Sequence, residues 1–225
     1  MQPPLRRLRL GWIPALLTLA ITVLRLAGER LGWPARWFSN AAGGGSALVG
    51  IVWLVPVFGA WFGYRLARAG RAPARPGRAL VLHLLGVVVF LAAFLKGIPA
   101  LPLATDTRAG LIAQILAMGA AAALALPWAW LGWPALATTS LLYALLARVP
   151  VVVITWLGLH AAWGTHYEKF GPRDYAGFTP NEAAFWLGFT QLTIWPAFTL
   201  VFGGLCGTLV AIAGSRRPAR EPASA

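Results

Sequence analysis

The sequence predicts an all-α protein, a polytopic transmembrane helical bundle of about six membrane-spanning helices with both termini in the cytoplasm. Three observations support this fold class. Of the 225 residues, 59% are hydrophobic and only 11% are charged, whereas soluble domains carry about 25% charged residues. So few charges cannot cover the surface of a large apolar interior in water. The apolar runs are also long, and they lack the period-two alternation of membrane β-strands.

The first three predicted spans follow from apolar runs long enough to cross a hydrocarbon core of about 30 Å, which takes roughly 20 residues. The first covers residues 10–29 and follows a cluster of three arginines. No small-x-small cleavage site follows it, so we expect a retained helix and not a signal peptide. The second span, residues 46–66, comes after the glycine-rich stretch 40–47, and the third, residues 79–96, comes after an arginine-rich loop.

The last three predicted spans cover residues 108–130, 135–163 and 180–213. The second of these is interrupted by a charged residue, Arg148. The third opens with Thr179-Pro-Asn-Glu182, which has the spacing of a capping box with proline at the first helical position. We therefore expect a single helical membrane domain over residues 1–214, followed by a disordered cytoplasmic tail over 215–225.

The orientation follows from the distribution of basic residues. With both termini inside, the inner segments hold eleven arginines and the outer segments hold seven arginines and lysines, which agrees with the positive-inside rule. Arginine outnumbers lysine seventeen to two, a bias typical of GC-rich bacterial genomes. We therefore predict a multi-pass protein of the bacterial inner membrane.

The expected surroundings are the lipid bilayer and other membrane proteins. The net charge is +13, but the basic residues form short clusters between apolar runs, so we expect no nucleic-acid partner. Two GxxxG pairs predict close helix packing inside the chain or contact with other membrane proteins. The chain has one cysteine and no Cys/His spacing typical of a metal site, so we expect no metal and no cofactor. The two pairs consist of Gly59, Gly63, Gly203 and Gly207.

Arg148 is a candidate binding residue, because an arginine at the centre of a bilayer costs about 2.5–3.5 kcal/mol and must face protein or water. Thr155 lies on the same helix face, and Pro150 frees a backbone carbonyl nearby. One hypothesis is a site for an anion or a lipid head group. The alternatives are a structural pair or a position near the membrane interface in a broken helix. The structural partners would be Gln114, Gln191 or a carbonyl of the bent helix.

The polar stretch 163–177 follows the fifth predicted span on the outer side and supplies candidate catalytic residues. His166 is the candidate acid or base, with Glu168 or Asp174 to orient it and Arg173 to hold an anionic group. No spacing here is diagnostic of an enzyme. An ordinary loop at the membrane surface therefore remains the alternative. On the first span, Arg25 and Glu29 are expected to neutralise each other, since they lie four residues apart on a helix.

Three functions are compatible with these residues. A non-catalytic accessory or assembly membrane protein is favoured, because catalytic motifs are absent from the sequence. The second is a transporter of small solutes or anions that uses the region around Arg148, where prolines interrupt the helices. The third is a membrane enzyme that acts on lipid or envelope precursors at the outer face through His166. Whether the protein is an enzyme stays open at this point.

Overall fold

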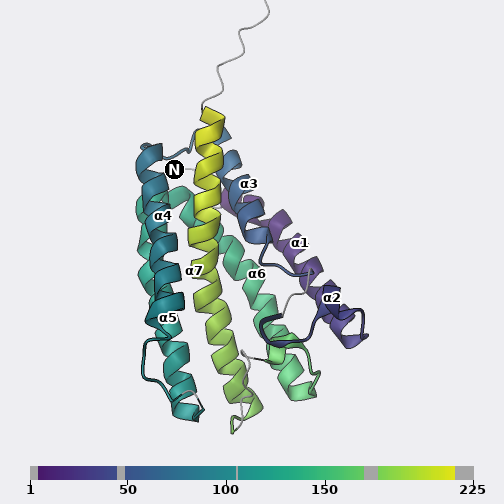
Figure 1. Cartoon of the computed structure of the whole chain (residues 1–225). Helices are drawn as coiled ribbons and strands as arrows, with labels where there is room; N and C mark the ends of the chain where they lie inside the picture. Colours follow the sequence, from purple (N-terminus) through teal and green to yellow (C-terminus); the bar gives the residue numbers. More distant parts are fainter. Residues whose placement is uncertain (1–4, 45–48, 105, 170–176, 216–225) are drawn as a thin grey trace, which may run out of the picture.

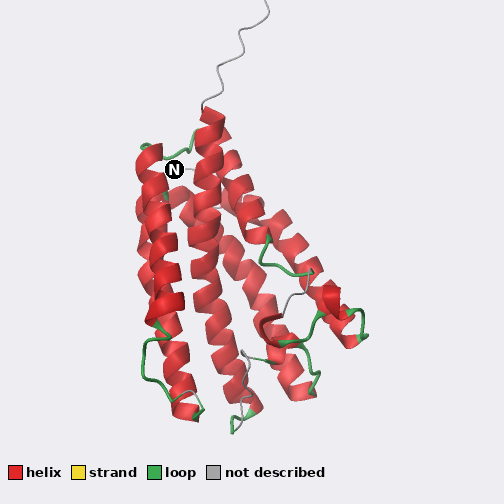
Figure 2. Ribbon diagram, viewed as in Figure 1, coloured by secondary structure: helices red, strands yellow, loops and turns green. Residues whose placement is uncertain are grey.

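The computed structural model describes residues 5–44, 49–104, 106–169 and 177–215 (Figures 1 and 2). These residues form helices joined by turns and loops, and none of them lies in a β-strand. The predicted all-α class is therefore confirmed. Arg173 and Asp174, two of the candidate site residues, lie outside the described residues. So does the predicted tail, except for Ser215, which ends the last helix.

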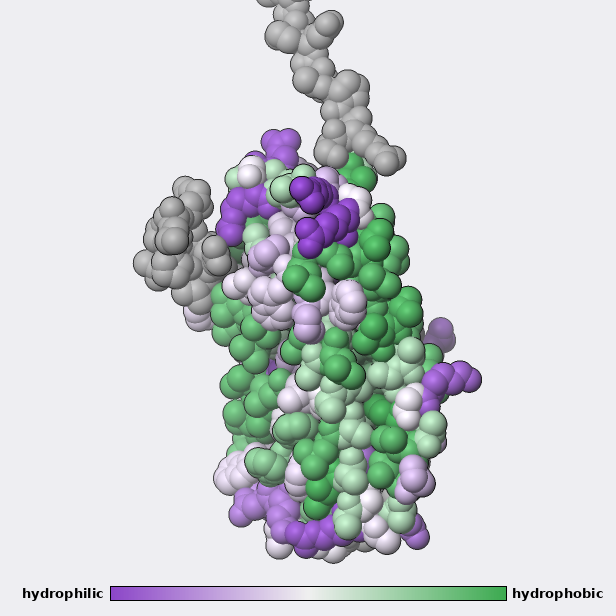
Figure 3. Space-filling model, turned by 90° about the vertical axis from the view of Figure 1, so that its left-hand side faces the viewer, coloured by the Kyte–Doolittle hydropathy of each residue, from purple (hydrophilic) through white to green (hydrophobic). Residues whose placement is uncertain are grey.

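Five helices are long and apolar enough to cross a membrane. Side chains on one face form a hydrophobic band between two hydrophilic ends (Figure 3), as expected for a surface in contact with lipid. The band is possible because leucine and valine occupy many exposed positions along these helices. The five are α1 (Leu5–Arg30), α4 (Pro76–Ala92, continued by the π-helix η2, Ala93–Gly97), α5 (Arg108–Gly132), α6 (Pro134–Ala161) and α7 (Pro180–Ser215).

The second predicted span, residues 46–66, is wrong in its length. The helix expected over residues 46–66 is α3, Leu54–Arg68, with 15 residues, or about 22 Å, which is too short to cross a hydrocarbon core of about 30 Å. Two contacts of the preceding chain accompany the late start. The Val49 amide donates to the Trp37 carbonyl at 3.2 Å and so is not paired within a helix. The Val49 carbonyl accepts a hydrogen bond from Arg25 at 2.9 Å.

The helix α7 lies at the centre of the bundle and contacts α3, α4, α5 and α6 (Figure 1). Its approach to α3 is very close. A Cβ atom added at Gly59 would lie 2.3 Å from the Gly203 carbonyl oxygen, and one added at Gly63 would lie 2.2 Å from that of Gly207. The predicted internal packing of the two GxxxG pairs is thus confirmed. These faces are occupied within the chain, which leaves them unavailable to a partner helix.

The first and last described helices begin and end at the same end of the bundle (Figure 1). We name this end the inner end, and the opposite end, where α1 finishes at Arg30 and α7 starts at Pro180, the outer end. Three short helices lie in the loops of the outer end. They are α2 (Ala35–Phe38), η1 (Ala42–Gly44) and η3 (His166–Glu168). The side of the membrane that each end faces stays a prediction.

Candidate functional site

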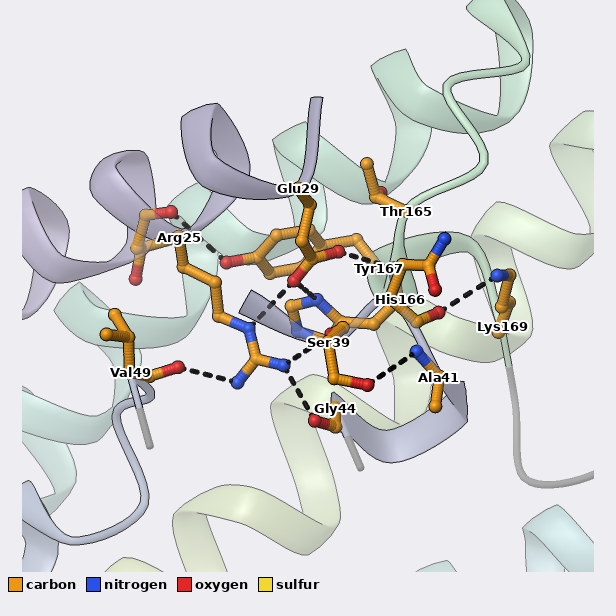
Figure 4. A network of polar contacts seen from close by, with 12 residues as sticks. Arg25, Glu29, Ser39, Ala41, Gly44, Val49, Thr165, His166, Tyr167 and Lys169 are labelled. Carbon is orange, nitrogen blue, oxygen red and sulfur yellow. Dashed lines mark hydrogen bonds and ion pairs between the residues drawn. The ribbon is translucent and has the colours of Figure 1, made fainter. Parts of the chain in front are cut away.

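Three side chains from two distant parts of the chain form a buried ionic cluster at the outer end, which we name the outer clasp: Arg25, Glu29 and His166 (Figure 4). Glu29 is its centre, and its side chain is fully buried. Its Oε1 accepts hydrogen bonds from Arg25 Nε at 2.8 Å and from His166 Nδ1 at 2.5 Å. Its Oε2 accepts one from the His166 backbone amide at 2.9 Å. The carboxylate therefore has a donor on each oxygen.

The clasp also holds the loop that joins α1 to α3. The guanidinium of Arg25 donates to the backbone carbonyls of Ser39, Gly44 and Val49, each at 2.9 Å (Figure 4). Lys169 adds a further tie through its Nζ, which donates to the Asn40 carbonyl at 2.9 Å. Charged donors to carbonyls are among the stronger hydrogen bonds in proteins. The two outer loops are thus fastened to α1 and to each other.

Tyr167 fastens the segment between α6 and α7 to the helices α1 and α6. Its hydroxyl donates to the Thr22 carbonyl at 3.2 Å, and its own carbonyl accepts from Thr155 Oγ1 at 3.1 Å. Burial raises the pKa of the Tyr167 phenol, so it is protonated at neutral pH. The structure therefore gives Thr155, a predicted binding residue, a hydrogen bond to the loop backbone.

The imidazole of His166 is buried beside the Glu29 carboxylate. Burial lowers its pKa below the ordinary value of 6.5, and the hydrogen bond to Glu29 opposes this only in part. Since Nδ1 faces the carboxylate, the proton of the neutral ring lies on Nδ1. A neutral imidazole held by a carboxylate is the pair that general-base chemistry uses.

The carboxylate that reaches His166 is not one of those predicted for it. Glu168 instead forms a capping box with Thr165, accepting from its amide at 2.9 Å and its hydroxyl at 2.8 Å. Glu29 was missed as a partner because its neighbour in sequence, Arg25, was enough to account for it. The predicted Arg25–Glu29 pair is present at 2.8 Å, but it forms only one part of the cluster.

A cavity of about 740 Å³ is lined by residues that run from the outer clasp, through the middle of the bundle, to Cys206 of α7. Its walls come from α1, α6, α7 and the residues just before and at the start of α3. The cavity therefore lies beside the residues before Leu54, where a full-length α3 was predicted. Non-helical backbone at membrane depth is tolerated when it lines such a cavity. The charged side chains that line it, among the described residues, are Arg25, Arg148 and Lys169, and all three are basic.

Arg148 lies at mid-length of α6 and is only 5% exposed. Its Nη1 donates to Gln191 Oε1 at 3.0 Å, and its Cζ lies 4.3 Å from the centroid of the Trp195 ring. The predicted pairing with Gln191 is confirmed. Both partners are neutral, and no carboxylate of the described residues forms a salt bridge with this guanidinium. The structural pair and the binding site are therefore compatible, because Arg148 also lines the cavity.

The described residues contain no group of three or more histidine, cysteine, aspartate or glutamate side chains that could hold a metal ion. Sequence reasoning missed the cavity and the role of Trp195, since neither α3's late start nor the side of α7 that faces α6 is visible in a hydropathy pattern.

Comparison with protein-family models, with curated proteins and with solved structures finds no match. A proposal about function therefore rests on the geometry of this cavity, whose lining is mainly apolar and whose charged residues are all basic.

Proposed function

We propose that the protein binds an anion inside the membrane and transports it or senses it, with Arg148 as the anion-binding group. The observation that carries this proposal is that Arg148 is buried beside a cavity and has only neutral partners. The proposal includes a place in a bacterial inner membrane with both termini in the cytoplasm. The distribution of arginines along the chain supports that part.

The energetics of a buried guanidinium favour a ligand of opposite charge. Removing an ion from water costs several kcal/mol even after relaxation. A hydrogen bond to a charged group returns about 1.5–3 kcal/mol, and a desolvated cation–π contact about 2 kcal/mol. Arg148 has one of each. An oxyanion would add the charge compensation that Gln191 and Trp195 cannot supply.

The geometry of the guanidinium also suits an oxyanion. Arginine carries five N–H donors in a planar fork, and the hydrogen bond to Gln191 uses Nη1. The other N–H groups of Arg148 remain for a ligand in the cavity. Carboxylates and phosphates accept two parallel hydrogen bonds from such a fork. Lys169 lines the same cavity toward the outer end and adds a positive charge there, whereas Arg25, which also lines it, is paired with Glu29.

The two alternative functions have less support from the geometry. The enzyme hypothesis assigned Glu168 to orient His166, but Glu168 caps η3. Glu29, which replaces it, accepts three hydrogen bonds that fasten the loops. The accessory hypothesis rests on the absence of catalytic motifs from the sequence, and the glycine faces that could have met a partner pack inside the chain. Neither alternative accounts for a buried, uncompensated arginine.

The test is anion binding by the purified protein in nanodiscs of neutral lipid, measured as the rise in melting temperature with ligand. A ligand at 100 times its dissociation constant stabilises the folded state by about 2.7 kcal/mol. We expect carboxylates or phosphates to stabilise the wild type and not Arg148→Met, which keeps an apolar side chain in the space of the arginine. Arg36→Met, at an exposed position of α2, is the matched control and should behave as the wild type.

Two results would overturn the proposal. One is the absence of any anion-dependent stabilisation of the wild type across carboxylates, phosphates and sulfate. The other is stabilisation that Arg148→Met retains in full. Since Arg148→Met removes a buried charge and keeps a long apolar side chain, it should stay folded, and its melting transition without ligand verifies this.

A further inference from the structure

The cavity is much longer than a small anion needs. The residues of α7 that line it run from Leu187 to Cys206, a distance of about 28 Å at 1.5 Å per residue. This is close to the roughly 30 Å thickness of a hydrocarbon core. The volume of about 740 Å³ lies in the range of roughly 300–1,000 Å³ that is usual for sites of single small molecules. A long and narrow ligand fits these dimensions better than a compact one.

The polarity of the lining changes along this length. Arg25 and Lys169 line the cavity near the outer end, and Arg148 lines it near the middle. From Trp195 toward the inner end, α7 presents apolar side chains, with the rings of Phe198 and Phe202 4.4 Å apart. We name this apolar stretch, Trp195, Phe198, Phe202 and Cys206, the trough. The cavity thus has a basic end and an apolar end.

The cavity also reaches the side of the bundle. Trp53 and Val52 both line it, yet they are 52% and 44% exposed. They lie immediately before α3, whose 15 residues extend only about 22 Å outward from the inner end. At that depth the surroundings of a membrane protein are hydrocarbon. The short α3 therefore leaves an opening toward lipid and not only toward water.

Resting on the proposed function, we propose that the ligand is a single-chain anionic amphiphile that enters from the lipid beside Trp53. Its head group binds Arg148, with Lys169 adding positive charge toward the outer end. Its chain lies along the trough, pointing to the inner end. This direction matches a molecule of the outer leaflet, whose head lies outward and whose chain lies inward. Charge complementarity selects the head, and the apolar trough selects the chain.

The test compares decyl phosphate, ethyl phosphate and uncharged decanol, bound to the protein in nanodiscs of neutral phosphatidylcholine. Binding to Arg148→Met measures the background of chains that enter the lipid, and is subtracted. We expect decyl phosphate to bind the wild type at least about tenfold more tightly than ethyl phosphate, which corresponds to about 1.4 kcal/mol. Decanol should show no binding that depends on Arg148.

A second variant tests the position of the chain. Cys206 is the single cysteine of the protein and lines the inner end of the trough. Cys206→Trp fills that end, so it should weaken the binding of decyl phosphate by about tenfold and leave that of ethyl phosphate unchanged. The unchanged arm also shows that the variant is folded.

The outcomes separate this inference from the proposed function. If both phosphates bind equally and depend on Arg148, the anion site stands and the amphiphile inference is overturned. If neither phosphate nor any other anion binds in an Arg148-dependent way, both are overturned. Equal Arg148-dependent binding of decanol would remove the requirement for an anionic head. Displacement of decyl phosphate by nanodiscs that contain phosphatidic acid would identify a two-chain lipid as the occupant and overturn the single-chain assignment.

Discussion

Glu29 in α1 and the imidazole of His166 in the loop before α7 lie 2.5 Å apart, although 137 residues separate them in the chain. This contact joins the end of the first helix to the segment that precedes the last one. Because Arg25 binds the same carboxylate and three carbonyls of the α1–α3 loop, the outer loops fold as one unit. That unit covers the outer end of the basic cavity.

Replacing Glu29 by glutamine should destabilise the protein severely. Removing one partner of a buried ion pair leaves the other charge uncompensated and costs about 3–5 kcal/mol, and the side chains of Arg25 and Glu29 are 9% and 0% exposed. The melting temperature in detergent measures the effect. The control is Glu182→Gln, which breaks the exposed pair with Arg108 and should leave the melting temperature nearly unchanged, because exposed pairs contribute little. Equal melting temperatures for the two variants would refute a structural role for the outer clasp.

Stability should fall when the pH is lowered below about 6.5. The folded state lowers the pKa of His166 from 6.5, so below that pH the unfolded chain binds a proton that the folded protein still resists. The contribution of His166 is complete above pH 6.5 and is lost as the pH falls through its folded pKa. Melting temperatures across pH 5–8 measure this loss.

The variant His166→Asn isolates the contribution of this histidine to the pH dependence. Asparagine keeps an N–H donor near the position of Nδ1 but does not titrate. We expect the variant to lose part of the acid-induced decrease. An identical pH profile in the wild type and the variant would exclude His166 as a titrating group.

A methyl group at Gly59 should destabilise the contact between α3 and α7. The added Cβ would lie 2.3 Å from a backbone oxygen of Gly203, so the helices must move apart, and overpacking of this kind typically costs 1–3 kcal/mol. Gly77→Ala is the matched control, because a Cβ there meets nothing within 4 Å. Its melting temperature should be unchanged or higher, since alanine favours a helix by up to about 1 kcal/mol over glycine. Comparable losses in both variants would contradict the close packing.

Arg148→Met should not lower the stability of the ligand-free protein. A buried charge without a countercharge is replaced by an apolar side chain, and such exchanges of buried ionic groups are often neutral or stabilising. Thermal unfolding without any added anion measures this. A large decrease would mean that the contacts of Arg148 with Gln191 and Trp195 are needed for folding.

Local features of the structure were predictable because a few neighbouring residues determine them. Thr179 and Glu182 form the predicted capping box, in which the Glu182 amide donates to Thr179 Oγ1 at 3.3 Å and Glu182 Oε2 accepts from the Thr179 amide at 2.9 Å. Five spans were predictable for a similar reason, since hydropathy summed over about 20 residues is enough to identify a membrane helix.

The second predicted span shows where the hydropathy of a single segment is not enough to predict a helix. Residues 46–66 have the composition of a helix, but a guanidinium from α1 binds the carbonyl of Val49, and α3 begins only at Leu54. Hydropathy carries no information about which distant donor reaches a given carbonyl. The cavity follows from this difference, because α3 leaves the outer half of α7 uncovered.

The sequence by itself determined that this chain is helical, that long segments of it suit a bilayer and that Arg148 needs a protected place, because length, hydropathy and charge are properties of single segments; that five and not six helices are long enough to span was decided by the structure. Only the tertiary structure decided that His166 meets Glu29 and that Arg148 faces a long basic cavity. Those relationships depend on which side chains packing brings together across more than a hundred residues, and a pattern within one segment cannot specify them.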